Sequence, residues 1–337
     1  MNTFFTALIT LFTAVSFAQK SQNVTTFENI KNTQIDIQCL NIDIKVIHDG
    51  STPHLKVGTQ VFDGTKANTD TDWNISVQKD AIKETIKVIC NYPSKVFVDK
   101  KLETQYRYYM ILRGPSTELN INSRVGKVSI NGWKQATHVV LENGSVSLEN
   151  TAAPFKVNMV KGNLDVTKHS GRLKADVFDG KLIFSGVEGN LDVTNFNGNS
   201  SLKGVNGDVN LNSKSGTTTV EGSSGTLKFD ADQGKLDLVS FQGAIEGVSD
   251  QAIITAKLTN PARFKATIKN ANIKLSVPSS SGAQVYFALS EGQFQAPSYL
   301  NKDEYGATKT LKGTLRGGES GRISITGEAG RVNLNTF

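Results

Sequence analysis

The chain has 337 residues, 30 glycines, seven prolines and a formal net charge of +6. Long stretches of helical periodicity are absent and apolar–polar alternation dominates, which excludes a helical protein and indicates β-structure. No dense run of lysine or arginine occurs, so nothing in the sequence points to a nucleic-acid-binding protein.

The first 18 residues, MNTFFTALITLFTAVSFA, predict a cleavable secretory signal peptide. Small residues, Ser16 and Ala18, stand three and one positions before the expected cut, although the usual basic residue near the start is missing. A membrane anchor is disfavoured because the apolar stretch is short and interrupted by threonines. No later segment is long and apolar enough to span a membrane. We therefore expect export to the periplasm, the cell surface or the extracellular space.

Residues 19–115 contain long alternating segments such as TQIDIQCLNIDIKVI and ETIKVIC. They predict an N-terminal antiparallel β segment that caps the region following it, with no flexible linker between the two. Cys39 and Cys90 each continue an alternating apolar series, so both should lie on a buried sheet face. Either a Cys39–Cys90 disulfide or two buried thiols would fit.

The segment YRYYMILRG, residues 106–114, is the best local candidate for a binding surface. Alternation places Tyr106 and Tyr108 on one side of a strand and Arg107 and Tyr109 on the other. Exposed tyrosines could stack on sugar rings or anchor a partner protein. Ordinary cross-strand packing is the competing interpretation.

Residues 116–277 repeat every nine residues. Fifteen consecutive units start between Thr117 and Gly243 without insertion or deletion, and glycine opens twelve of them. The second and fourth residues after the opening position are apolar in 26 of 30 cases; the exceptions are Thr137, Ser200, Thr218 and Gly247. Each unit therefore predicts a short half-buried strand followed by a corner.

Glycines also recur at the sixth position after the opening residue, but at multiples of eighteen residues: Gly132, Gly186, Gly204 and Gly222. Alternate corners must therefore differ. The sequence predicts an all-β fold, a β-solenoid or flattened two-sheet parallel β-helix, with eighteen residues per coil. Apolar residues at the seventh position are expected to plug the corners: Phe178, Val187, Phe196, Val205 and Phe241.

In residues 278–337 the rhythm first breaks at the segment PSSSG and then returns in GRISITGEAGRVNL. We expect a hairpin or loop excursion followed by a C-terminal coil or cap, because the ends of such a stack need covering. This end is also the most basic part of the chain. Residues 261–337 contain ten basic and five acidic side chains, a balance that could attract anionic glycans, lipid headgroups or nucleic acid, or simply be a solvated surface.

Motifs for catalysis, cofactors or metals are missing from the sequence. No nucleophile elbow, phosphate-binding loop or zinc spacing occurs, and the acids Asp165, Asp192 and Asp237 fall on opposite sheets of the expected fold. General acid–base catalysis needs two positioned titratable groups. We therefore expect no catalytic, cofactor or metal site.

An export signal, an N-terminal β segment, glycine-punctuated Gly-x-Leu-x-Val units and a final GRISITGEAGRVNL together resemble the bacterial "putative adhesin" domain of unknown function, and are similar to autotransporter-type adhesin head domains. The resemblance implies a non-enzymatic envelope or surface protein whose partners are glycans or proteins on a cell surface. Two alternatives stay open: a β-helix enzyme acting on polysaccharide, and an accessory of envelope-stress signalling.

Overall fold

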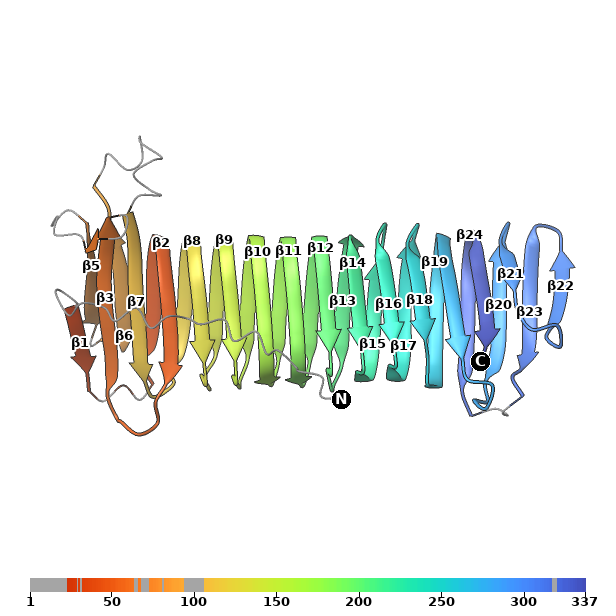
Figure 1. Cartoon of the computed structure of the whole chain (residues 1–337), viewed down its shortest axis with the longest axis horizontal. Helices are drawn as coiled ribbons and strands as arrows, with labels where there is room; N and C mark the ends of the chain where they lie inside the picture. Colours follow the sequence, from red (N-terminus) through yellow and green to blue (C-terminus); the bar gives the residue numbers. More distant parts are fainter. Residues whose placement is uncertain are drawn as a thin grey trace, which may run out of the picture.

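The computed structural model describes residues 23–28, 30, 32–63, 66–67, 73–80, 82–93, 106–316 and 320–337. The expected signal peptide lies outside these residues. All regular secondary structure in the described part is β-strand, which confirms the expected all-β class. The strands stand side by side along an elongated rod, with the N-terminal strands at one end and the C-terminal strands at the other (Figure 1).

The middle of the rod is built from parallel strands whose partners lie eighteen residues apart, as in the pairs Phe155↔Leu173 and Leu173↔Leu191. We call this part the ladder and each eighteen-residue repeat a rung. Long strands form the first rungs: β8 (Glu118–Asn131), β9 (Thr137–Glu149), β10 (Phe155–Ser170), β11 (Leu173–Glu188) and β12 (Leu191–Lys203). The following rungs are divided into shorter strands: β13 (Val209–Ser215), β14 (Thr217–Glu221), β15 (Ser224–Ala231), β16 (Lys235–Val239), β17 (Gln242–Asp250) and β18 (Ile253–Lys257). The last strand of the ladder, β19 (Asn260–Val277), is long again.

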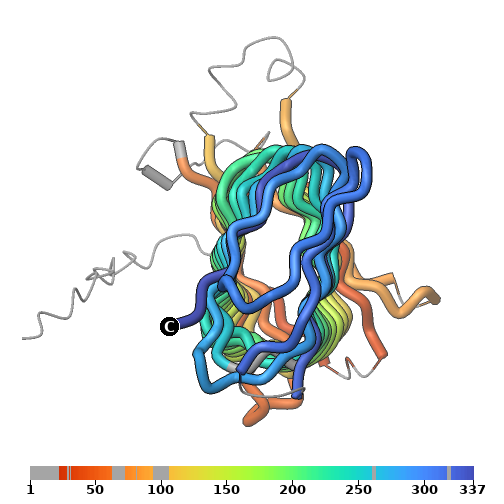
Figure 2. Tube along the Cα trace, turned by 90° about the vertical axis from the view of Figure 1, so that its right-hand side faces the viewer, coloured from red at the N-terminus to blue at the C-terminus, as the bar shows by residue number. Residues whose placement is uncertain are grey.

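Seen along the rod, each rung follows the same flattened outline with two long sides and two corners (Figure 2). We call the two long sides face A and face B. Face A carries the outward side chains of the first half of each rung, such as residues 118–122, and face B those of the second half, such as residues 127–131. Residues nine apart in the sequence therefore lie on opposite faces.

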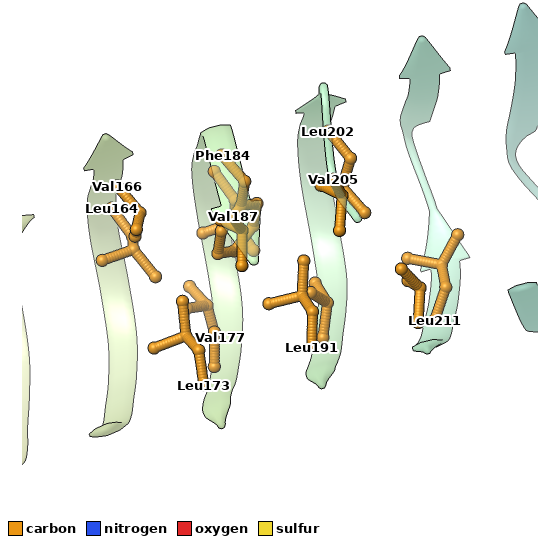
Figure 3. Close-up of a cluster of buried hydrophobic side chains, with 14 of the residues drawn as sticks. Leu164, Val166, Leu173, Val177, Phe184, Val187, Leu191, Leu202, Val205 and Leu211 are labelled. Carbon is orange, nitrogen blue, oxygen red and sulfur yellow. The ribbon is translucent and has the colours of Figure 1, made fainter. Parts of the chain in front are cut away.

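A narrow apolar core lies between the two faces. Leucine, valine and phenylalanine side chains from successive rungs point inward and stack along the rod (Figure 3). Buried residues of the N-terminal segment, the ladder and the C-terminal segment form one contiguous cluster. Each rung thus gains its stability by burial against its neighbours.

The four exceptions to the apolar pattern have local explanations. Ser200 and Thr218 are buried but bonded within their own rungs, Ser200 to Asn195 Nδ2 at 3.0 Å and Thr218 to Ser213 Oγ at 3.2 Å. Thr137 donates to the carbonyl of Gln135. A Cβ at Gly247 would lie 2.5 Å from the Phe229 ring of the preceding rung, so the small residue makes room for the large one.

Glycine is needed in the ladder for two different reasons. At Gly144 a Cβ would lie 1.9 Å from the carbonyl oxygen of Gly126, so any side chain would force neighbouring rungs apart. At Gly222 there is open space, but φ is +56°, in the left-handed region that L-residues avoid. The close approach at Gly144 comes from the backbone of the neighbouring rung, whereas the positive φ at Gly222 comes from the shape of the corner itself.

The two corners of each rung differ in burial, which corrects part of the expectation for the seventh position. Val187, Val205 and Phe241 are buried and fill one corner as expected. Phe178 and Phe196 lie at the other corner and are 52% and 45% exposed. The nine-residue repeat does not predict this difference in burial, because it gives the same position to residues that alternate between the two corners.

At the N-terminal end, the expected antiparallel pairing is present but covers only part of the segment. Strand β2 (Gln34–His48) lies parallel to β8 on one side. On its other side it lies parallel to β6 (Thr85–Asn91) and β7 (Tyr106–Gly114). Antiparallel pairing is confined to the strands outside these: β1 (Asn23–Phe27), β3 (Leu55–Asp63), β4 (Lys66–Ala67) and β5 (Asn74–Asp80). Alternation of apolar residues cannot distinguish the two directions.

Strand β2 is itself a rung. Its inward residues change phase between Cys39 and Ile42, and Ile42 pairs with Gly126, the opening residue of a ladder unit. Its corner is backed by the hydroxyl of Tyr92, which accepts the N–H groups of Leu40 at 2.6 Å and Asn41 at 3.2 Å. Cys39 and Cys90 form a disulfide that joins β2 to the end of β6.

At the C-terminal end, the last strand of the sequence is not the last strand of the rod. Strand β24 (Arg322–Thr336) pairs in parallel with β19 on one side and with β20 (Gln284–Ser290) and β21 (Gln293–Gln295) on the other. Strands β23 (Thr308–Thr314) and β22 (Asn301–Tyr305) then cover the end in antiparallel pairing. The excursion therefore forms the outer cap, and the returning chain fills the gap behind it.

Candidate binding face

Face A presents two long rows of polar side chains in register along the ladder. The pairing of the strands aligns His138, Lys156, Lys174 and Asp192 in successive rungs of one row. The neighbouring row contains Val140, Asn158, Asp176, Thr194 and Asn212. Because rungs repeat at about 4.8 Å, each row offers a regular series of contacts to an extended partner.

Open grooves run beside and between these rows. The corner groove, about 400 Å³, lies between the row of Asn158 and the exposed corner. The basic groove, about 370 Å³, has a floor that includes Ala136 and Pro154 and lies beside His138, Lys156 and Lys174. The distal groove, about 400 Å³, lies further along the same face between Asp192 and Asp230. All three are open, as suits a ligand that lies on the surface.

Two asparagines on this face have covered acceptor atoms. The side-chain oxygens of Asn158 and Asn212 are shielded from solvent and have no hydrogen-bond donor among the described residues. The amide nitrogen of Asn158 lies 3.1 Å from His138 Nε2. Asn158 lines the corner groove and Asn212 the distal groove, so a ligand hydroxyl could reach either oxygen only if the side chain turned towards its groove.

Charges in the middle of face A are mutually compensated. Arg172 is ion-paired with Asp192 at 3.0 Å and Lys174 with Asp176 at 3.2 Å. Hydrogen bonds from Asn210 and Arg172 hold the pKa of Asp192 below its usual range. Partial burial and the nearby Lys156 ammonium lower the pKa of His138, so its imidazole is neutral at neutral pH. This part of the face is polar, ordered and close to neutral.

Face B has a different chemistry. Its middle row consists mainly of short side chains, including Ser129, Ser147, Ser201 and Thr219, which align through the strand pairing. Ile183, an apolar residue at an outward position, lies between Asp165 and Ser201 in this row. Face A therefore offers the longer and more varied side chains for recognition.

An apolar ridge borders face A at the exposed corner. Val160, Phe178 and Phe196 occupy the same corner position in successive rungs and are 56%, 52% and 45% exposed. The two phenylalanine rings stack on one another with centroids 4.9 Å apart. Val160 also lines the corner groove, so the ridge and the groove form one continuous surface.

The aromatic segment of β7 does not form the single binding patch suggested by Tyr106, Arg107, Tyr108 and Tyr109. Tyr108 is fully buried, and its hydroxyl donates to the carbonyl of Asn91. Tyr106 stacks on the buried Trp73 with centroids 3.9 Å apart. Arg107 and Tyr109 lie on the opposite side of the strand, with Arg107 exposed and Tyr109 partly buried. Cross-strand packing, the competing interpretation, therefore describes Tyr106 and Tyr108.

Titratable side chains do not gather into a chemical centre in the described ranges. No group of three or more His, Cys, Asp or Glu there could hold a metal ion. Two hydroxyl–imidazole pairs occur there: Thr151 Oγ1 lies 2.9 Å from His169 Nδ1, and Ser116 Oγ lies 2.9 Å from His48 Nδ1. The same hydroxyl accepts the backbone N–H of Lys134 at 3.0 Å, so it links the first rungs to each other. Within the described part of the chain, no helix is long and apolar enough to cross a membrane.

Several solved structures are similar to this chain at low identity. A putative adhesin from Parabacteroides distasonis is 8% identical, with 94% of this chain and 97% of that chain covered and a TM-score of 0.32. A putative adhesin from Parabacteroides merdae is 13% identical, with coverage of 95% and 97% and a TM-score of 0.30. A putative cell adhesion protein from Clostridium sporogenes is 12% identical, with coverage of 94% and 99% and a TM-score of 0.22. Likenesses at these values establish neither the fold nor the function of this chain.

No family model matches the chain, and no curated protein matches it.

Proposed function

We propose that this protein is a non-enzymatic, exported binding scaffold, a β-solenoid that holds glycan or protein partners along face A. The observation that carries the proposal is the register of face A. Outward side chains repeat in straight rows over successive rungs, next to open grooves and an exposed apolar ridge. A rigid surface of this kind supports many weak contacts with an extended partner.

The proposed organisation follows from the same features. Residues 1–18 are removed as a signal peptide, 19–115 close one end, 116–277 form the ladder, and 278–337 close the other end. The Cys39–Cys90 disulfide fits an exported protein, because disulfides persist in oxidising compartments. We place the protein in the periplasm, at the cell surface or outside the cell.

A non-enzymatic role is favoured over a polysaccharide-cleaving one by the arrangement of the acids on face A. Asp176 and Asp192 are each paired with a cation, and Asp192 is held ionised by its hydrogen bonds. A glycosidase needs one carboxyl group with a raised pKa opposite a second carboxylate. Open, shallow grooves also do little to exclude water from a reacting bond.

Binding should be tested with the mature chain, residues 19–337, on a glycan array and in a pull-down from surface extracts. The blocking variant Asn158→Arg/Asn212→Arg fills the corner and distal grooves of face A. The matched control, Ser147→Arg/Ser201→Arg, adds the same two charges at exposed positions of face B. We expect the blocking variant to lose the signal and the control to keep it.

Two results would contradict the proposal. One is silence of the mature chain in both assays. The other is equal loss of signal in the two variants while circular dichroism shows both folded, because that would place the binding elsewhere than face A.

A further inference from the structure

The C-terminal part of face A carries an excess of positive charge that the middle of the face lacks. Lys228 on β15, Lys265 on β19 and Arg322 on β24 are exposed, as is Arg263 beside Lys265. We call these four residues together with Tyr286 on β20 the C-terminal basic patch. It accounts for part of the basic excess of residues 261–337 noted in the sequence.

Strand pairing brings the patch together from segments far apart in the sequence. In one row, Glu246 pairs with both Lys228 and Lys265, and Ser324 pairs with both Lys265 and Tyr286. In the adjacent row, Arg263 pairs with Arg322, and Arg322 with Gln284. The patch therefore spans five adjacent strands, roughly 20 Å along the rod.

Few carboxylates neutralise these cations. Arg263 forms an ion pair with Glu246 at 2.7 Å. Asp230, two positions from Lys228 in the sequence, pairs with Lys214 at 3.3 Å. Beyond Asp230, the next row of face A continues with Val248, Thr267 and Thr326, which carry no charge. Among the described residues, these four cations thus share the surface with one paired carboxylate, Glu246.

Tyr286 gives the patch a second kind of contact. Its side chain is 44% exposed in the row that contains Lys265, between Ser324 of β24 and Lys312 of β23. A tyrosine ring provides an apolar face on which a sugar ring can pack, together with a polar hydroxyl. Arginine guanidinium groups bind carboxylate or sulfate through paired hydrogen bonds, and lysines add further point charges.

We propose that the C-terminal basic patch binds an acidic polysaccharide, a glycan bearing carboxylate or sulfate groups, laid along the rod axis. This inference rests on the proposed function, since it assigns a ligand class to one part of the binding face. A nucleic acid fits less well, because single strands are held by several stacking aromatics and the patch offers one. A lipid surface fits less well, because the patch consists of four cations and one tyrosine, and the exposed apolar residue in the adjacent row is a single valine, Val248.

The probes are heparin, which is sulfated, and polygalacturonate, which is carboxylated, with neutral dextran as the uncharged comparison. The patch variant is Lys265→Ser/Arg322→Ser. The matched control is Lys274→Ser/Arg331→Ser, which removes the same two charges from β19 and β24 on face B, nine residues further along each strand. The two variants have the same net charge as each other, two units below that of the unmodified protein, and both lose only exposed side chains.

We expect the patch variant to bind at least one of the two acidic polysaccharides about tenfold more weakly, with less than about a threefold change in the control. Replacement of Tyr286 by Ser should weaken binding, whereas Tyr286→Phe should retain it, because the ring and not the hydroxyl packs on the sugar. Dextran should not bind detectably.

The inference is overturned if neither acidic polysaccharide binds, if the two double variants weaken binding equally, or if a DNA oligonucleotide or anionic vesicles bind more tightly than both polysaccharides at the same salt concentration. Failure here remains distinct from failure of the proposed function. If neither acidic polysaccharide binds but the groove-blocking variant abolishes a glycan-array or pull-down signal, the inference fails and the proposed function stands. Silence in every assay would contradict both proposals.

Discussion

At the scale of single residues, the ladder depends on glycines that recur at fixed positions in successive rungs but differ in physical role. Gly180 has no room for a side chain, since a Cβ would lie 2.0 Å from the carbonyl oxygen of Gly162. Gly222 has room but requires a left-handed backbone. Three rungs already tolerate another residue at the latter position: Asn150, Lys168 and Ser240 adopt φ of +51°, +55° and +56°.

The two glycine roles predict different costs of substitution. Gly222→Ala should lower the free energy of unfolding by about 1 kcal/mol, and Gly222→Asn by less, because only backbone strain is added. Gly180→Ala should cost roughly 3 kcal/mol or more, since a rung must move. Denaturant unfolding followed by circular dichroism measures both. Equal costs would mean that the close backbone approach is not what requires glycine.

His169 predicts a pH dependence of stability. It is buried in a corner, with Nδ1 2.9 Å from Thr151 Oγ1, and burial lowers its pKa from 6.5 to about 4. Between these values the unfolded chain binds the proton more readily, so stability falls as the pH falls from 6.5 towards 4. The loss should reach at most about 3 kcal/mol.

The variant Thr151→Val/His169→Val tests this origin, because valine already occupies the same corner at Val187 and Val205. The difference in unfolding free energy between pH 7 and pH 4 should shrink in the variant by about the amount assigned to His169. Identical pH profiles for the two proteins would assign the acid sensitivity to other groups.

At the scale of elements, the corners are where sequence and structure agree least. The rows of inward leucine and valine, the two corner types and the eighteen-residue register could be predicted, because alternation and glycine spacing follow directly from strand and corner geometry. The exposure of Phe178 could not be predicted, because the same position in the next unit, Val187, faces inward. The rung formed by β2 was hidden because Ile42 stands where other rungs have glycine, and Tyr92, distant in sequence, completes its corner.

The corner difference gives a direct prediction. Phe241→Ala should cost about 3–5 kcal/mol because it empties a buried corner. Phe178→Ser should cost at most about 1 kcal/mol, the loss of an exposed ring stack with Phe196. Thermal unfolding of the two variants measures the contrast. A larger loss for Phe178→Ser would show that the exposed corner is covered in the folded protein.

The disulfide links β2, the first rung, to β6, the strand outside it. Cys39 and Cys90 are separated by 51 residues in the sequence. In the chain-entropy model, the variant Cys39→Ala/Cys90→Ala should lose about 4 kcal/mol of unfolding free energy. Unfolding of the unmodified protein with and without reductant should reproduce the loss. A reductant effect that persists in the double variant would contradict this assignment.

The binding face was only partly predictable for the same reason as the corners. The outward rows of face A follow from the repeat, but the grooves depend on which side chains are short, as at Ala136 and Pro154. The C-terminal basic patch joins β15, β19, β20 and β24, whose order in the rod differs from their order in the chain. Composition predicts the excess of positive charge but not its position on the rod. Arg322 lies next to Arg263 only because β24 returns to pair with β19.

At the scale of the whole molecule, the rod is a one-dimensional stack in which the unit of addition is eighteen residues. Both ends are closed by antiparallel strands. Within the described residues, the strands that pair on one side only are β1, β4 and β5 at one end and β21 and β22 at the other. Because each rung contacts chiefly its neighbours, a complete rung should be removable without loss of the fold.

The most direct test of the eighteen-residue rung is a pair of deletions that start at the same residue. Deletion of residues 190–207 removes one rung and brings Gly189 to Asp208, which keeps every later strand on its own face and corner. Deletion of residues 190–198 removes half a rung and transfers each later strand to the opposite face. We predict a cooperatively folded rod, shorter by about 4.8 Å in small-angle scattering, for the first deletion. The second should unfold at a much lower denaturant concentration. Equal stability of the two deletions would contradict the eighteen-residue rung and the two distinct faces built on it.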